Sequence, residues 1–568
     1  MDPPRSAPPV SQLLEQAISI RERRFNPEVG FISAKGGGPG YHTRTTKDQT
    51  VHHIHDTAQY AQLLLMRGRP EDVTRASEIL SKLVDLQVTD PGSKFYGLWG
   101  WFVEEPPEKM APADWNWADF IGARLAEILK NHAAPLDPAL VVRLRESLRH
   151  ASNCIIKRNI GPGYTNICAM GAAVTLAAGE ILDEPSFVDY GRRRISAQRV
   201  SFERNGGVPE YNSPDYGVVL IQELERILRL VEDPAARADA EWMRQKAWIL
   251  TAEQFHPGTG QWAGAQSRAY SGQLRGSLAL YLWLRSGVPP RGVETMPFNA
   301  FPDLLDNRTE FACPPEAVMR FARLPADPHE VRQVWMLPRG SIPEVALTSW
   351  FTANACLGSI NEETTWVQHR PITAFWATDS GNTASFRVNL LKDGKEFASG
   401  RLRIRQSGPR LLAVLGLAMG QGDWHVSLDR PKDGVFRASD LRLRCLLESP
   451  GAQVESLPSG TWTLGTGSHR MAIHPGEVLF DGQPGRWASG SDAKGAFVDA
   501  ILHTGSPVSF KPEALGETTA AFGLEMLTAA ESPSPQPISC QALETHRSWR
   551  WQPVPGDVQA PRHLAPLP

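Results

Sequence analysis

The loop at residues 205–217, NGGVPEYNSPDYG, holds more proton-donating and proton-accepting side chains than a turn between two helices requires. It places tyrosines and acidic residues beside the glycines and prolines that form the turn. Tyrosines and carboxylates can transfer protons in general acid and base catalysis. We therefore expect Glu210, Tyr211 and Tyr216 to lie at a cleft. The alternative is a plain turn, shaped by proline and solvated by its charged residues.

Four further loops carry side chains of the same kind. The loop at 35–61 is rich in histidine, and the loop at 99–120 combines tryptophans with acidic residues. The loop at 159–171 leads into an apolar segment, and the loop at 256–273 precedes another. The candidate catalytic or substrate-binding residues in these loops are His42, Arg44, His53, Trp115, Trp117, Asn166, Trp262, Arg268 and Tyr270.

Several of these residues also have simpler explanations. Asn166 could merely cap the helix that follows it, and the tryptophans could fill a large core instead of stacking on sugar rings. His53, His55 and Asp56 could bind a metal ion, but their spacing matches no strong zinc pattern such as HExxH. We therefore predict no metal ligands and no firm cofactor, and leave a structural divalent metal open.

The composition excludes several classes of protein. The 59 Lys and Arg residues nearly balance 62 Asp and Glu, for a net charge of −3, which argues against a nucleic-acid or acidic-membrane partner. The six dispersed cysteines suggest neither a disulfide framework nor a zinc site. As written, the sequence predicts a soluble, cytoplasmic protein, or a periplasmic or secreted one if a signal peptide has been removed. A homo-oligomer is compatible with it.

The spacing of hydrophobic residues changes along the chain and predicts a multidomain α+β protein. Residues 1–287 show a helical period in about ten segments with short connections, which predicts an α/α toroid of antiparallel hairpins. The nearly all-apolar segment 166–182 fits an inner helix. After an irregular, Pro-rich linker at 288–345, a period of two predicts a sandwich-like antiparallel β-sheet domain at 346–530. A Pro-rich tail at 531–568 is expected to wrap or fray.

The side chains in the loops are those that β-elimination of a uronic-acid polysaccharide requires. The sugar carboxylate must be neutralised by groups such as Asn, His or Arg, because negative charge develops when the C5 proton leaves. A base such as His or Tyr removes that proton, and an acid such as Tyr protonates the leaving oxygen. Free tyrosine has a pKa near 10 and is a poor base, so we expect Arg268 or Arg44 to lower the pKa of a catalytic tyrosine.

The order of the two halves resembles that of the toroid polysaccharide lyases, the alginate lyase and heparinase II/III-like group. Residues 164–182, YTNICAMGAAVTLAAGEIL, are similar to the segment where those enzymes carry an Asn at the start of an inner helix. Residues 205–224, NGGVPEYNSPDYGVVLIQEL, are similar to their segment with a catalytic Tyr. Two positions depart from the pattern: Asn205 precedes the glycine where the group often has Asp, and Ile167 replaces the His that commonly follows the Asn.

The resemblance implies a lyase that acts on an acidic polysaccharide or oligosaccharide. In that role Asn166 would neutralise the uronate carboxylate and Tyr216 would transfer a proton, with Tyr211 as the weaker choice. His53 would be the base or a second neutralising group, with His42 or His55 as alternatives.

Two other functions fit the same residues. A glycoside hydrolase on the same toroid would need two carboxylates about 5–5.5 Å apart for retention or about 6.5–9.5 Å for inversion. The candidates are Glu105, Asp114, Glu210 and Asp215. A non-catalytic carbohydrate-binding protein would explain the tryptophans but not the His, Tyr and Arg residues collected on loops of one half.

Overall fold

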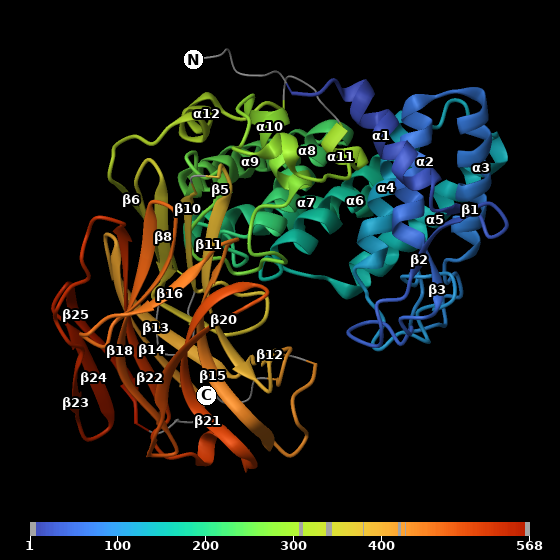
Figure 1. The fold of residues 1–568 in the computed structure, drawn as a ribbon. Helices are drawn as coiled ribbons and strands as arrows, with labels where there is room; N and C mark the ends of the chain where they lie inside the picture. The colour runs from blue at the N-terminus through green and yellow to red at the C-terminus, as the bar shows by residue number, and fades with distance from the viewer. Residues whose placement is uncertain are drawn as a thin grey trace.

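The computed structural model describes residues 7–305, 311–336, 344–378, 380–417, 422–426 and 428–562. A helical N-terminal half, blue to green in Figure 1, is followed by a β half, yellow to red. The helices are α1 (Val10–Glu22), α2 (Ile54–Arg67), α3 (Pro70–Asp85), α4 (Trp117–Asn131), α5 (Pro138–Arg158), α6 (Thr165–Leu182), α7 (Pro185–Asn205), α8 (Pro214–Leu230), α9 (Pro234–Gln254), α10 (Gly276–Ser286), α11 (Pro302–Leu305) and α12 (Pro315–Ala322).

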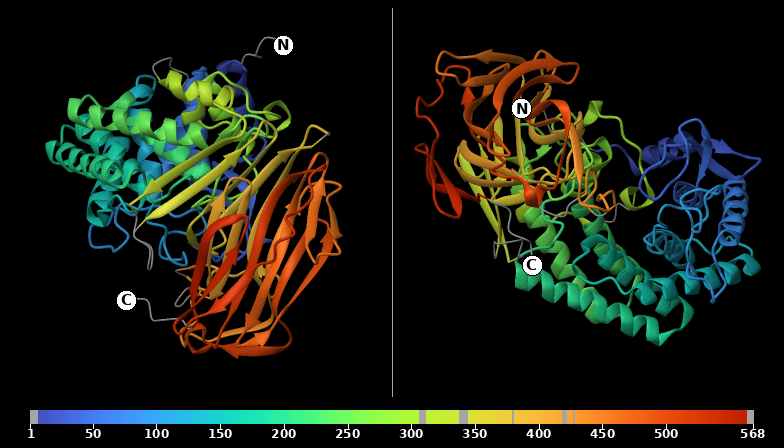
Figure 2. Two further views of the ribbon diagram at one scale, coloured as in Figure 1. Left: turned by 90° about the vertical axis from the view of Figure 1, so that its left-hand side faces the viewer. Right: turned by 90° about the horizontal axis from the view of Figure 1, so that it is seen from below.

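The helical half is the predicted α/α toroid. The hairpins α2–α3, α4–α5, α6–α7 and α8–α9 follow one another, and the first helices of successive hairpins contact each other from α2 through α8, which in turn contacts α10. The second helices form the outer layer, where α3 contacts α5 and α7 contacts α9. Seen from below, the helices curve in an arc, and the β half lies against its green end (Figure 2). The prediction of fold class is confirmed.

Helix α6 is the inner helix that the sequence predicts. It is long and apolar enough to cross a membrane, but 89% of it is buried inside the protein, as in the core helix of a globular domain. Small residues let neighbouring helices approach closely. A Cβ added at Gly179 would lie 2.7 Å from the backbone nitrogen of Val188 on α7, so only glycine fits there.

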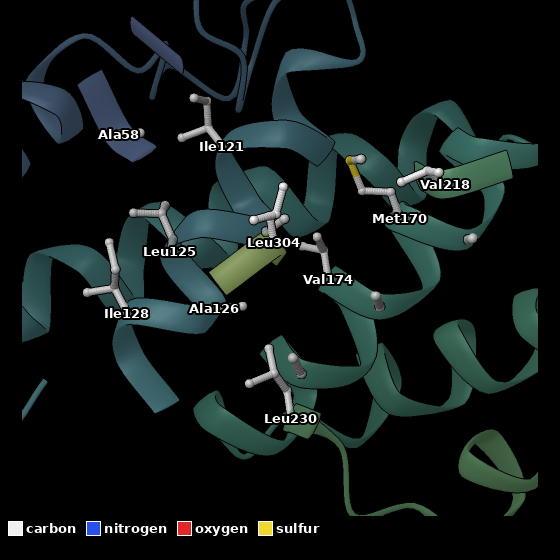
Figure 3. Packing of buried hydrophobic residues seen from close by; sticks show 14 of the residues in the cluster. Ala58, Ile121, Leu125, Ala126, Ile128, Met170, Val174, Val218, Leu230 and Leu304 are labelled. Carbon is white, nitrogen blue, oxygen red and sulfur yellow. The ribbon is translucent and has the colours of Figure 1, made fainter. Parts of the chain in front are cut away.

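The short helix α11 packs in the centre of the toroid, between the inner helices. Its Leu304 is fully buried and belongs to the same core cluster as Leu125 of α4 and Val174 of α6 (Figure 3). The Asp303 carboxylate accepts hydrogen bonds from Arg124 of α4 at 2.9 Å and from Arg226 of α8 at 2.7 Å. Because these partners come from different hairpins, α11 ties the inner helices together.

The described residues of the β half form two large antiparallel sheets and one small sheet. The nine-stranded sheet has the order β20-β21-β15-β11-β10-β8-β7-β6, with β12 on β11, and the eight-stranded sheet has the order β16-β17-β18-β22-β14-β13-β9, with β19 on β18. Their strands are β6 (His329–Trp335), β7 (Val345–Phe351), β8 (Ala355–Ile360), β9 (Glu362–Thr364), β10 (Ile372–Ala377), β11 (Thr383–Lys392), β12 (Lys395–Glu396), β13 (Gly400–Ser407), β14 (Arg410–Leu417), β15 (Phe436–Glu448), β16 (Gln453–Ser456), β17 (Trp462–Thr466), β18 (His469–Phe480), β19 (Gln483–Pro484), β20 (Arg486–Asp492), β21 (Gly495–Phe510) and β22 (Thr519–Thr528).

Three regions contain more regular structure than their composition suggests. The predicted linker at 288–345 contains α11, α12 and the edge strand β6. The predicted C-terminal tail forms a third sheet on β13 and β14, in which Trp549 and Trp551 are fully buried. Two small β elements also interrupt the helical half. The strands concerned are β23 (Ser539–Ala542), β24 (His546–Trp551) and β25 (Val554–Pro561) at the C-terminus, and β1 (Phe25–Asn26), β2 (Phe31–Lys35), β3 (Thr50–His53), β4 (Phe255–His256) and β5 (Gln261–Trp262) in the helical half.

The two halves are joined through the loops that precede α8 and α10. The Tyr211 hydroxyl donates to Glu363 Oε2 at 2.6 Å. Gln266 and Arg370 exchange two backbone hydrogen bonds, at 2.9 and 2.8 Å, as an isolated antiparallel bridge. Loops rich in candidate residues are therefore fixed by strands of the β half.

Candidate active site

Tyr216 lies in the first turn of α8 and faces a second tyrosine. The Ser213 hydroxyl caps the helix by accepting from the Tyr216 amide at 3.1 Å, and Pro214 occupies the first helical position, where its missing N–H costs nothing. The hydroxyls of Tyr216 and Tyr270 are 2.5 Å apart. The sequence predicted both residues for the site, and the structure brings them into direct contact.

Arg268 organises this pair. Its Cζ lies 4.2 Å from the centroid of the Tyr216 ring, within the range of a cation–π interaction, and its Nη2 donates to the Tyr270 hydroxyl at 3.4 Å. Its Nη1 donates to Glu210 Oε1 at 3.0 Å, and its Nε donates to Gln368 Oε1 at 2.8 Å. The guanidinium is thus held from both halves of the molecule.

Asn166 supports Glu210 from behind. Its Nδ2 and its backbone N–H donate to Glu210 Oε2 at 2.7 and 3.0 Å. Asn166 is fully buried, whereas the sequence placed its amide against a substrate carboxylate. In this structure the amide contacts Glu210 instead, and it fixes the carboxylate that holds Arg268.

A third tyrosine, Tyr164, was not selected from the sequence. Its hydroxyl accepts from Asn116 Nδ2 at 3.2 Å, and Asn116 Oδ1 accepts from Arg158 at 2.7 Å. Burial raises the pKa of Tyr164, and Arg268 opposes that rise. Tyr164 directly precedes the helix that begins with Thr165 and Asn166, in a loop already identified, so its position beside the Asn was the available signal.

The surroundings of Tyr216 keep its hydroxyl protonated. Burial raises the pKa of Tyr216 well above its usual value, and the hydrogen bond to Tyr270 adds to this, while Arg268 acts in the opposite direction. Arg268 therefore has the predicted sign of effect on Tyr216, but burial outweighs it. For Arg268 itself, burial would lower the pKa, yet Tyr216, Tyr270 and Glu210 together raise it. The site holds a phenol next to a permanent cation.

Tyr216 and Tyr270 line a cavity of about 1100 Å³ inside the toroid. Its walls are the N-terminal halves of α2, α4, α6, α8 and α10, together with part of α1 and residues 296–303. Glu223 of the wall pairs with Arg226 behind it, and the other charged side chains of the wall pair with one another. The pairs are Arg21 and Arg24 with Asp56, Arg124 with Asp303, and Arg275 with Asp215.

His55, rather than His53, lies in the wall of this cavity. Burial, helped by the charge of Arg124, lowers the pKa of His55 to about 3, so its ring is neutral. His53 lies at the N-terminus of α2 with its ring 4.8 Å from that of Phe102, and burial lowers its pKa. Within the described ranges, no group of three or more His, Cys, Asp or Glu residues is placed to hold a metal ion.

The predicted residues of the histidine-rich loop lie near its junction with residues 99–120. His42 is buried, its Nδ1 is 2.7 Å from the Pro112 carbonyl, and its ring lies 3.6 Å from that of Tyr41. Arg44 is exposed, and its backbone N–H donates to Glu105 Oε1 at 2.6 Å.

The remaining predicted residues have largely structural contacts. The ring of Trp115 lies 6.0 Å from that of Phe95, and the ring of Trp117 lies 5.8 Å from that of His55. Trp262 is buried and donates to Asn212 Oδ1 at 2.6 Å. Tyr211 packs against Trp335 at the junction of the two halves, with 5.4 Å between ring centroids, so it lies away from the cavity wall.

Two lyases are among the solved structures to which the chain is similar. One is the chondroitin AC lyase of Streptomyces coelicolor A3 in complex with chondroitin sulphate, with a TM-score of 0.31 and 9% identity over 91% of this chain and 96% of that chain. The other is the heparan sulfate lyase HepC from Pedobacter heparinus, with a TM-score of 0.33 and 9% identity over 98% and 90%. Similarity at this level carries no information on the reaction of this chain.

Comparison at the level of sequence is more specific. No curated protein matches the chain. One family model, described as "Domain of unknown function (DUF8769)", matches residues 11–313. This match covers more than half of the chain and contains helices α2 to α11, with Tyr216, Arg268 and Tyr270. The chain therefore belongs to the DUF8769 family.

Proposed function

We propose that this protein is a lyase that cleaves a uronic-acid-containing polysaccharide by β-elimination. The observation that carries the proposal is the contact of Tyr216 with Tyr270 at the wall of the cavity, with Arg268 against both. Two phenols in direct hydrogen-bond contact beside a fixed cation form a proton-transfer pair in which one member can hold a proton while the other gives one up.

The contacts suggest a role for each tyrosine. The Tyr270 hydroxyl is 2.5 Å from that of Tyr216 and accepts from Arg268, and Tyr270 is the more exposed of the two residues, at the side from which a substrate would approach. As the base, Tyr270 would remove the C5 proton. The C4–O bond would then break as the C4=C5 double bond forms, and Tyr216 would protonate the leaving oxygen. A proton passing from Tyr270 to Tyr216 along their hydrogen bond would restore both residues.

The cavity also suits an acidic substrate. The positive ends of the dipoles of α2, α8 and α10 lie at its wall, because residues from the first turn of each of these helices line it. The arginines of the wall are paired with carboxylates, so the side chains leave little net charge to repel a uronate. In this scheme Asn166 acts through Glu210, as a positioning residue for Arg268.

Glycoside hydrolysis is the second candidate, and the contacts of Glu210 and Asp215 favour it less. A general acid must have a proton to donate. Glu210 accepts hydrogen bonds on both of its oxygens, from Arg268 and Asn166. Asp215 likewise accepts on both oxygens, from Arg275 and from the Tyr270 amide. In both residues, each carboxylate oxygen already accepts from a donor.

A screen of uronate polysaccharides tests the proposal. The substrates are alginate, glucuronan, hyaluronan, chondroitin and heparan types, and the readouts are ultraviolet absorbance of the unsaturated uronate and new reducing ends. We expect the two signals to rise together on at least one polymer. Reducing ends without absorbance would show a hydrolase instead. Binding without either signal, unaffected by Tyr216→Phe, would show a carbohydrate-binding protein.

A further inference from the structure

The cavity of the toroid is closed at the end away from Tyr216 and Tyr270. The cavity is lined by the N-terminal halves of the inner helices. Further toward the C-terminal ends of these helices, α11 fills the centre of the toroid. Leu304 is buried there in the same cluster as Leu125 and Val174 (Figure 3). Asp303 ties α11 to α4 and α8 through Arg124 and Arg226. The end of the cavity away from the tyrosine pair is therefore filled by side chains of α11 and its neighbours.

The exposure of the wall residues shows which side is open. Tyr270 is 51% exposed, and the Arg275 side chain is 53% exposed. Arg124 is only 3% exposed and lies next to α11. The tyrosine pair therefore stands near the mouth of the cavity, and the paired charges of Arg124 and Asp303 form its floor.

Two side chains of the wall have a buried nitrogen without a hydrogen-bond partner among the described residues: Nε of Arg124, whose other nitrogens are paired, and the amide nitrogen of Gln222. Gln222 of α8 lines the cavity and is 6% exposed, and its Nε2 has no hydrogen-bond partner among the described residues. A buried amide donor without an acceptor is unfavourable, and a ligand oxygen would satisfy it. Gln222 follows Tyr216 by six residues, which places it about 9 Å further along the helix axis at 1.5 Å per residue. This separation leaves room for sugar between the reacting groups and the floor.

We propose that the cavity is a blind pocket that holds one end of the substrate chain, with Gln222 hydrogen-bonding the terminal sugar. The charged groups of the floor already pair with one another, so the recognition is of hydroxyl oxygens and not of an extra charge. A pocket that admits only a chain end makes cleavage exolytic, and the enzyme releases mono- and disaccharides. The statement about cleavage rests on the proposed lyase function, whereas the statement about end binding does not.

The first experiment follows products on the polymer that the screen identifies. At early times we expect unsaturated mono- and disaccharides, while the mass of the polymer and the viscosity of the solution barely change. A ladder of long unsaturated oligosaccharides with a rapid loss of viscosity would overturn the proposal, because it requires cuts within the chain.

The second experiment measures binding without turnover. The Tyr216→Phe variant is titrated in a calorimeter with uronate oligosaccharides that carry a bulky fluorophore at the reducing end, at the non-reducing end, or at neither. We expect one of the two labels to abolish binding and the other to be tolerated. Tolerance of both labels, or no binding of any oligosaccharide, would overturn the pocket. End-selective binding together with no absorbance in wild-type assays would refute the lyase and leave the pocket standing.

A substitution at Gln222 identifies the contact itself. In the Tyr216→Phe background, Gln222→Leu should weaken oligosaccharide binding about tenfold, as expected for the loss of a buried hydrogen bond. The control is Gln245→Leu, at an exposed position on α9, which should bind like its parent. Equal affinity in the two variants would contradict the role of Gln222. Circular dichroism and thermal melting show whether each variant is folded.

Discussion

Tyr216 is the residue whose hydroxyl has the clearest single task. Its ring packs under Arg268 and its hydroxyl contacts only Tyr270 among the hydrogen bonds of the described structure. Replacement by Phe keeps the ring contact and removes the proton. We expect kcat to fall about 10²–10⁴-fold, the usual effect of losing a general acid, with little change in KM. Steady-state kinetics on the identified polymer measure both.

The ionisation of Tyr216 adds a prediction on pH. Because burial raises the pKa of Tyr216 above that of a free phenol, about 10, the acid stays protonated through neutral and mildly alkaline solution. Activity should therefore show no loss from deprotonation of this acid between pH 7 and about 10. A fall in kcat with a midpoint in this range, on an enzyme shown to remain folded, would contradict the assignment of Tyr216 as the acid.

A second single residue, His55, makes the free energy of unfolding depend on pH. Its pKa is about 3 in the folded protein and about 6.5 in an unfolded chain. Between these values the unfolded state binds more protons, so stability falls as the pH drops below about 6.5. When the pH is lowered from 7 to 5, the free energy of unfolding should fall in both proteins. The fall should be about 1–2 kcal/mol smaller in His55→Gln than in the wild type. Denaturant titrations at both values test this, and parallel curves for the two proteins would refute it.

At the scale of the element, the short helix α11 is expected to stabilise the toroid. Leu304→Ala removes a fully buried side chain from the centre of the toroid, and should lower the free energy of unfolding by about 2–5 kcal/mol. Val142→Ala on α5 is the control, since Val142 is 65% exposed and its replacement should change stability by less than about 0.5 kcal/mol. Thermal melts compare the two variants. A similar melting temperature for both would mean that α11 does not stabilise the toroid.

The sequence predicts most elements because their signals are local. The apolar segment predicted as an inner helix at 166–182 matches α6, Thr165–Leu182, and the loops that precede α8 and α10 supplied Tyr216, Arg268 and Tyr270. Contacts between distant loops leave no such signal. The burial of Asn166 behind Glu210 depends on the packing of two hairpins, as does the choice of His55 over His53 for the wall.

The C-terminal strands β23–β25 escaped prediction for a different reason. Strands β23–β25 are short and lie among prolines, so their alternation is weak. They are stabilised by burying Trp549 and Trp551 on β13 and β14, which only the folded β half provides.

The same reasoning applies to the contact of Gln368 with Arg268. Nothing in its own segment shows that it accepts a hydrogen bond from Arg268 a hundred residues earlier.

At the scale of the whole molecule, Gln368 couples the β half to the site. Gln368→Ala removes the acceptor for Arg268 Nε and should lower kcat about tenfold through a loosely held guanidinium, with KM little changed. Gln368→Glu keeps an acceptor oxygen and should restore most of the activity. An effect on KM alone, or no rescue by Glu, would show that the residue does not act by positioning Arg268.

The backbone bridge between Gln266 and Arg370 has a consequence for how the protein matures. It joins residues about a hundred positions apart, and contacts of such long sequence separation form late in folding. The toroid leaves the ribosome before the β half, and can form its hairpins from local contacts alone. The loop that carries Arg268 and Tyr270 is completed only when the later half docks against it. We therefore expect the growing chain to pass through a stage in which its helices are present and the loop with Arg268 and Tyr270 has not yet docked.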